Sequence, residues 1–107
     1  MISKKHRVNK GLFDQIFKQG QIIHAPIYVF KYLKNLENKG FYAFVVPKTV
    51  AKSAVKRNAL RRKGYTHLRE IGIKSGISGV FFYKKGTSTA KTQEIKESID
   101  LVLKNIK

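Results

Sequence analysis

The stretch that decides the fold is FYAFVVPKTVAKSAVKRNALRRKGYTHLREI, residues 41–71, in which a strand pattern gives way to a helix pattern. Residues 41–46 are mostly β-branched or aromatic, and the run stops at Pro47, which has no N–H to donate to a sheet. Residues 51–71 predict a helix with one narrow apolar arc made by Leu60, Gly64, Leu68 and Ile71. Gly64 costs a helix about 1 kcal/mol relative to Ala, so it either lets the helix approach a sheet closely or kinks it.

Upstream of this stretch, the pattern predicts one helix and one strand. Residues 9–20 form the helix, with Asn9 as its cap and Gly20 as a left-handed residue after the last turn. Residues 26–33 form the strand, and its short connection to residues 41–46 predicts an antiparallel hairpin.

Downstream, residues 77–84 predict a third strand, and Thr92 can cap a last helix. The apolar stripe of that helix consists of Ile95, Ile99, Val102, Leu103 and Ile106. The order α-β-β-α-β-α predicts an α+β fold, a sandwich of helices packed on a mixed sheet. A short extra strand at residues 48–50 is an open alternative. A chain of 107 residues suits one domain, residues 1–107.

The charge balance indicates a polyanionic partner. The chain has 23 Lys and Arg residues against six Asp and Glu, a formal net charge of +17 at pH 7. Such a chain repels itself when folded, and a polyanion relieves that repulsion. Nucleic acid fits better than a membrane surface, because most of the aromatic residues fall in strand-like runs and not on one face of a basic helix. No apolar run approaches the ~20 residues that span a bilayer.

The basic residues concentrate in one acid-free segment. From Asn38 to Arg69 there are nine basic residues and no acidic one. A solvated helix face usually mixes both signs, since like charges four residues apart destabilise a helix. Arg57 and Arg61 stand at that spacing, and we expect both to face solvent. The segment therefore predicts phosphate contacts, whose strength falls steeply with salt.

The same segment resembles the signature of the ribonuclease P protein family, the small subunit of the bacterial ribonucleoprotein that matures the 5′ end of tRNA. The family pattern is a strand ending in a basic pair, then Ala-Val-x-Arg-Asn-Arg-x-Lys-Arg on a helix. The residues that match are Ala54, Val55, Arg57, Asn58 and Arg62; Arg61 stands for Lys and Ala59 for Arg. Further matches, in the right order, are Phe13, Ile16-Phe17-Lys18, Gly20 and Val80-Phe81-Phe82, so the resemblance covers nearly the whole chain.

This resemblance implies two RNA contacts. The basic helix would meet the catalytic RNA subunit through Lys48, Lys52, Lys56, Arg57, Asn58, Arg61 and Arg62. A cleft between the first helix and the sheet would bind the 5′ leader of precursor tRNA through Phe13, Phe17, Val29 and Lys31. From the residues alone, Phe13 and Phe17 are expected to pack in a core stripe with Leu12 and Ile16. With the resemblance, part of that stripe is expected to be core and its aromatic edge to be shared with the leader.

The orientation of the first predicted strand has two solutions. In the family that the chain resembles, an aromatic residue of this strand often faces the leader, and ungapped spacing from Gly20 puts Lys31 at that position. The resemblance therefore implies that Tyr28, Phe30 and Tyr32 lie in the core and that Val29 and Lys31 face the leader. A shift of one residue reverses the two sets, and the tyrosines would then be the stacking platform.

A protein-owned active site is not expected. The six acids are scattered or lie on the last helix, where Asp100 can pair with lysines four residues away. His6, His24 and His67 are far apart, and there is no cysteine, which fits a cytoplasmic protein. The resemblance implies that the RNA subunit supplies the chemistry with Mg²⁺ and that the protein alone binds no cofactor.

Two other functions fit the composition. A ribosomal or other structural RNA-binding protein shares the size and charge but has no need of an aromatic cleft. A protein that coats DNA is the less favoured alternative, and neither DNA nor a membrane is an expected partner.

Overall fold

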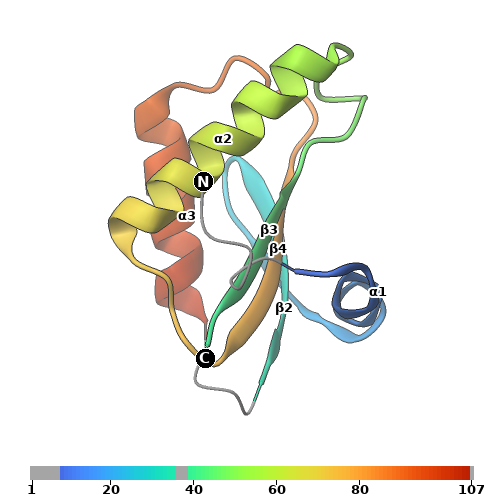
Figure 1. Cartoon of the computed structure of the whole chain (residues 1–107). Helices are drawn as coiled ribbons and strands as arrows, with labels where there is room; N and C mark the ends of the chain where they lie inside the picture. The colour runs from blue at the N-terminus through green and yellow to red at the C-terminus, as the bar shows by residue number, and fades with distance from the viewer. Residues whose placement is uncertain (1–7, 36–38, 107) are drawn as a thin grey trace.

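The computed structural model describes residues 8–35 and 39–106. Its elements, in chain order, are α1 (Lys10–Gln19), β1 (Gln21–His24), β2 (Tyr28–Lys34), β3 (Phe41–Val45), α2 (Ala54–Ile71), β4 (Ile77–Tyr83) and α3 (Thr92–Asn105). The four strands form one mixed sheet, with α2 and α3 on one face and α1 on the other (Figure 1). The predicted α+β class is confirmed, as are all three predicted helices and all three predicted strands, with small shifts at their ends.

The sheet order is β1-β2-β4-β3, which corrects the predicted hairpin. β4 lies between β2 and β3, antiparallel to β2 and parallel to β3. Six of the seven β4 residues are buried, and a central position between two strands suits so apolar a segment. The short connection between β2 and β3 favoured direct pairing of these two strands. The burial of β4 instead favours the central place in the sheet, between β2 and β3. The turn predicted at residues 36–40 includes residues 36–38, which lie outside the described residues.

The extra strand is β1, and residues 48–50 form a turn instead. β1 pairs antiparallel with β2 and is the edge of the sheet. The chain enters β1 directly from α1, which explains why Gly20 is extended, with φ −69°, and not left-handed as predicted.

The helix starts also differ in detail from the prediction. Asn9 caps α1 as expected, its side chain accepting from the Leu12 N–H. α2 begins at Ala54, three residues later than predicted, because the N–H groups of Val50 and Ala51 both donate to the carbonyl of Pro47 in a turn. α3 has Lys91 at its cap position, not Thr92, and the Glu94 carboxylate accepts from the Lys91 N–H at 2.9 Å.

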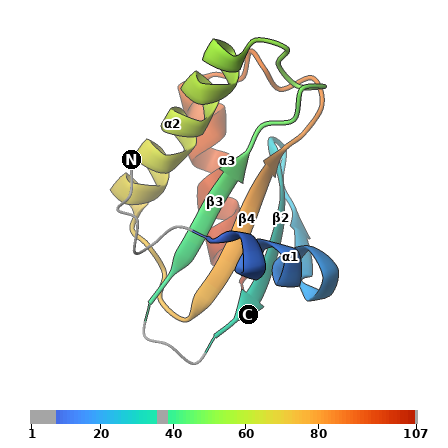
Figure 2. The ribbon, with the colours of Figure 1, turned by 45° about the vertical axis from the view of Figure 1, so that its right-hand side comes forward.

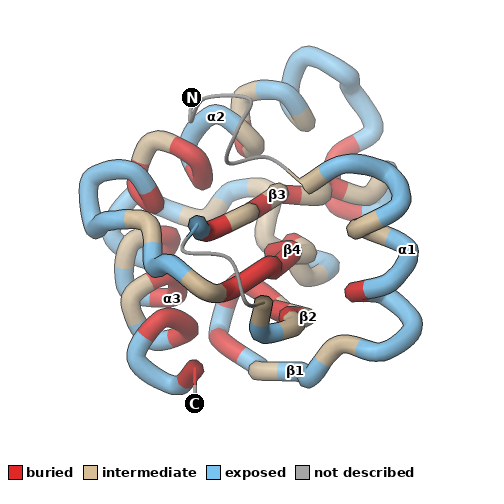
Figure 3. Tube along the Cα trace, turned by 60° about the horizontal axis from the view of Figure 1, so that its bottom comes forward, coloured by how far each residue is buried: buried red, intermediate tan, exposed pale blue. Residues whose placement is uncertain are grey.

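The core lies between the sheet and the pair α2 and α3, where the buried parts of the trace meet in Figure 3. Gly64 allows this close packing: a Cβ there would lie 2.5 Å from a ring carbon of Phe44. The Tyr83 hydroxyl donates to the Leu60 carbonyl at 2.6 Å, and the Phe44 N–H donates to the Tyr65 hydroxyl oxygen. Gly64 therefore serves close approach, and two hydrogen bonds hold α2 on the sheet.

Candidate RNA-binding surfaces

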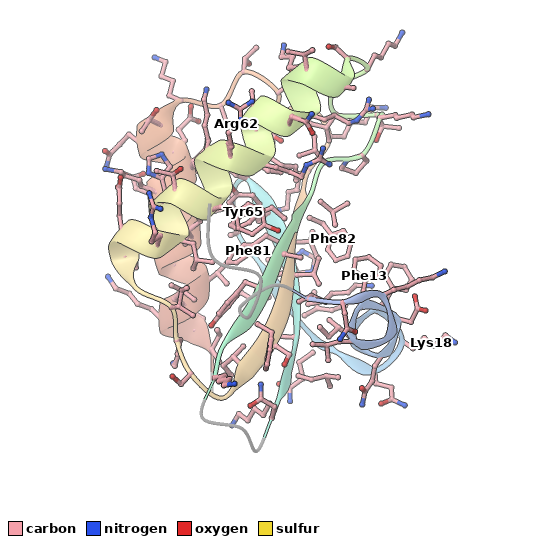
Figure 4. All side chains as sticks on the ribbon, in the orientation of Figure 1. Phe13, Lys18, Arg62, Tyr65, Phe81 and Phe82 are labelled. Carbon is pink, nitrogen blue, oxygen red and sulfur yellow. The ribbon has the colours of Figure 1, made fainter. Side chains whose placement is uncertain are left out.

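The basic segment, residues 48–62, runs from the turn after β3 into the first turns of α2. The Ser53 side chain caps the helix by accepting from the Lys56 N–H, and the first turn of α2 holds no acid. Five predicted RNA-binding residues of this segment are exposed: Lys48, Lys52, Lys56, Asn58 and Arg62. In Figure 4, Arg62 lies on the side of α2 away from the sheet and Tyr65 on the side toward it. The segment thus presents cations to solvent, and its own residues include no Asp or Glu.

Arg57 and Arg61 do not point freely into solvent, contrary to expectation. Both are half-buried. The Arg57 guanidinium donates to the carbonyls of Ala51 and Lys52, at 3.1 and 2.7 Å. Arg61 donates to the Asn58 side-chain oxygen. Arg57 therefore stabilises the turn that precedes α2, in addition to any contact that it makes with RNA.

A second surface lies on the opposite face of the sheet. We define the aromatic surface as Phe13 and Phe17 of α1, Lys31 of β2 and Phe82 of β4. The rings of Phe13 and Phe17 stack with centroids 6.3 Å apart, and Phe82 meets their edges at 6.0 and 6.2 Å. Figure 2 shows α1 crossing β4 and β2 on the face that α2 and α3 leave uncovered. Phe17 is 55% exposed, so this cluster is only partly a core.

The register of β2 follows the spacing argument. Tyr28, Phe30 and Tyr32 are buried on the side of α2 and α3. Burial raises the pKa of the Tyr28 hydroxyl far above its usual range, so this group stays neutral in the core. Val29 and Lys31 are half-buried on the side of α1. The alternative register, with the tyrosines on the α1 side, is wrong.

Phe82 was not among the predicted site residues, although the sequence carried a signal for it. β4 is buried at every position except Phe82. Alternation along a strand places Phe81 and Phe82 on opposite faces, as Figure 4 shows. Phe81 lies in the main core, and the ring of Phe82 contacts the rings of Phe13 and Phe17 on α1. A strand-by-strand assignment of faces would have included it.

The carboxylates of the described residues do not converge. Asp100 pairs with Lys104 at 2.8 Å on α3, as the spacing predicted. Glu70 lies 3.4 Å from His67 and 3.5 Å from Lys96, and the hydrogen bond with His67 lowers the pKa of its carboxyl. Within residues 8–35 and 39–106, no group of three or more His, Asp or Glu side chains could hold a metal ion. In the same part of the chain, no helix is long and apolar enough to cross a membrane.

Comparison with known proteins decides the family. The family model described as Ribonuclease P matches residues 2–107. The chain belongs to the ribonuclease P protein family. It is therefore the RNA-binding protein subunit of the endonuclease that matures the 5′ end of tRNA, a reaction in which the RNA subunit of the ribonucleoprotein is the catalyst. The comparisons give no support to a ribosomal protein.

Solved ribonuclease P proteins share this fold. The ribonuclease P protein of Thermotoga maritima, in complex with 1-(4-fluorophenyl)-2-thiourea, is 25% identical with a TM-score of 0.80, covering 89% of this chain and 94% of that one. A second structure of the Thermotoga maritima protein has a TM-score of 0.83 at 24% identity, covering 94% and 97%. The Staphylococcus aureus protein has a TM-score of 0.78 at 19% identity, covering 92% and 93%. No curated protein matches.

Proposed function

We propose that the two surfaces divide the RNA contacts of the ribonuclease P protein. The basic segment binds the catalytic RNA through Lys48, Lys52, Lys56, Arg57, Asn58, Arg61 and Arg62. The aromatic surface, with Val29 beside it, binds the 5′ leader of precursor tRNA. The observation that carries this division is the position of α1 and α2 on opposite faces of one sheet (Figure 1). One small subunit can then hold the catalytic RNA and the leader at the same time.

The chemistry of each surface suits its proposed ligand. Exposed Lys and Arg side chains without competing acids suit the dense phosphates of a folded RNA. Exposed aromatic rings beside an ammonium suit a single strand, because every base has a face that stacks and every nucleotide carries a phosphate. Such contacts accept any sequence, as a subunit that meets many leaders requires.

We propose that Mg²⁺ belongs to the assembled ribonucleoprotein and not to the protein. The described carboxylates lie apart or pair with lysines, so this donor set does not fit a metal. The proposed place of action is the cytoplasm, and the proposed partners are the catalytic RNA and precursor tRNA in preference to DNA.

Leader binding is tested by Phe17→Leu in the reconstituted holoenzyme. Leu keeps the helix and the apolar contacts but removes the aromatic face, and stacking contributes about 1–3 kcal/mol per base. We expect affinity for precursor tRNA to fall about fivefold or more, while affinity for mature tRNA stays unchanged. Crosslinkers in the leader should map to Phe17 and Lys31.

Leu101 provides the matched control. It is another exposed apolar side chain, on α3 and remote from the aromatic surface, so Leu101→Ala should change neither affinity. Equal losses for precursor and mature tRNA with Phe17→Leu would rule out a leader contact at this surface.

A further inference from the structure

Lys31 occupies the place on the aromatic surface where a base would stack. Its ammonium nitrogen lies 4.0 Å from the ring centroid of Phe17 and 5.9 Å from that of Phe82. Both distances are within the range of a cation–π interaction. Lys31 stands in β2 between Ile22 of β1 and Val80 of β4, and the sheet fixes its backbone there. The side chain therefore covers one face of the Phe17 ring.

Phe17 is also the ring that a ligand can reach most easily. It is 55% exposed, whereas Phe13 and Phe82 are half-buried and in contact with it. A base that stacks on the face covered by Lys31 needs the same space as the ammonium. The base and the ammonium cannot both lie against that face.

We propose that Lys31 is a positioning residue that leaves Phe17 when the leader binds and then contacts a leader phosphate. This inference rests on the proposed function of the aromatic surface. In the free protein, the ammonium shields the exposed ring from water and from non-specific partners. In the complex, a base takes the ring face and the freed ammonium pairs with the backbone of the same strand.

The magnitudes favour this exchange. A cation–π contact at an exposed site corresponds to about two- to fivefold in affinity. Stacking of one base on an aromatic ring corresponds to about five- to 150-fold. The base therefore displaces the ammonium with a net gain, before any phosphate contact is added. The flexible stem of a lysine allows its ammonium to move without a change in β2.

The exchange has a signature in the salt dependence of binding. The contact with a leader phosphate weakens as the salt concentration rises. The loss of the cation–π contact between Lys31 and Phe17, in contrast, lowers the affinity for the leader at every salt concentration. Removing the charge of Lys31 should remove both effects. A variant without the charge is then weaker than wild type at low salt and stronger at high salt.

The experiment compares Lys31→Gln and Lys31→Arg in the holoenzyme reconstituted with its catalytic RNA. The measured quantity is the affinity for a cleavage-resistant precursor tRNA divided by the affinity for mature tRNA, over a series of salt concentrations at constant Mg²⁺. We expect the log–log line of Lys31→Gln to be shallower by about 0.7. It should cross the wild-type line and lie about two- to fivefold above it at high salt. Lys31→Arg should keep the wild-type slope.

Two outcomes overturn the inference in different ways. A Lys31→Gln line that keeps the wild-type slope shows that the ammonium makes no contact with a leader phosphate. A line that is shallower but lies below wild type at every salt concentration shows that leader binding does not cost the contact between Lys31 and Phe17. If Phe17→Leu lowers the ratio as expected, the leader surface stands and only the exchange is wrong. If Phe17→Leu leaves the ratio unchanged, the proposed leader surface is wrong as well.

Discussion

Reversing Lys56 and Arg62 together to Glu is expected to reduce affinity for the catalytic RNA about 100-fold or more, while the free energy of unfolding stays nearly the same. Both side chains are exposed on α2. Each hydrogen bond from a charged group contributes about 1.5–3 kcal/mol, and reversal adds repulsion from phosphate. The salt slope of binding should also fall by about one for each lost contact. Filter binding across a salt series measures both quantities.

The matched control reverses Arg69 and Lys74. These are again one Arg and one Lys, both exposed, at the far end of α2 and in the loop after it. The double variant changes the net charge equally, so it should show only the weaker long-range effect. If both pairs lose the same affinity, total charge and not the basic segment determines binding.

Arg57 is a poor choice for such a test, although the signature points to it. Its guanidinium donates to two carbonyls of the turn before α2. A substitution there removes these bonds as well as any RNA contact. The loss of RNA binding would then have two causes that the measurement does not separate.

Phe81→Ala is expected to lower the free energy of unfolding by about 3–5 kcal/mol, whereas Phe82→Ala lowers it by about 1–3 kcal/mol. Phe81 is fully buried and stacks on Phe44 at 4.5 Å, with Phe30 at 4.4 Å. Removing such a ring leaves a cavity in the main core. Phe82 is half-buried and loses two edge contacts with α1, each contributing about 0.5–1.5 kcal/mol. Urea unfolding measures both values.

The effect on RNA should be the reverse of the effect on stability. Holoenzyme with Phe82→Ala should bind precursor tRNA more weakly relative to mature tRNA, because the leader surface has lost a ring. Phe81→Ala should leave that ratio unchanged under conditions where the protein is folded. Equal stability losses for the two variants would contradict the assignment of these neighbours to opposite faces of the sheet.

Local patterns predicted most of the elements, because local sequence determines them. The spacing of Ile95 to Ile106 identified the buried stripe of α3, and every residue of that stripe is buried. The strand β1 was not predicted, because its four residues are mostly exposed and carry no alternation of apolar side chains. It forms only because β2 offers a free edge for pairing, and local sequence does not contain that information.

The sheet order and the roles of single side chains depend on contacts between distant segments. The parallel pairing of β3 with β4 joins residues on either side of α2. The short β2–β3 connection had instead predicted a hairpin of β2 and β3. The basic segment was predictable because charge is visible in composition. The hydrogen bonds of Arg57 were not predicted, because they depend on the conformation of the turn before α2. The face of Phe82 follows from alternation along β4 and was overlooked.

Reconstitution with the catalytic ribonuclease P RNA of the same organism tests the central claim most directly. The account predicts that the protein binds this RNA and lowers the Mg²⁺ concentration needed for cleavage of precursor tRNA at the mature 5′ end. The stimulation should be larger for precursors that carry a leader long enough to reach the aromatic surface. Cleavage that is unchanged by the protein at every Mg²⁺ concentration, with ribosomal RNA as the species recovered from cells, would contradict it.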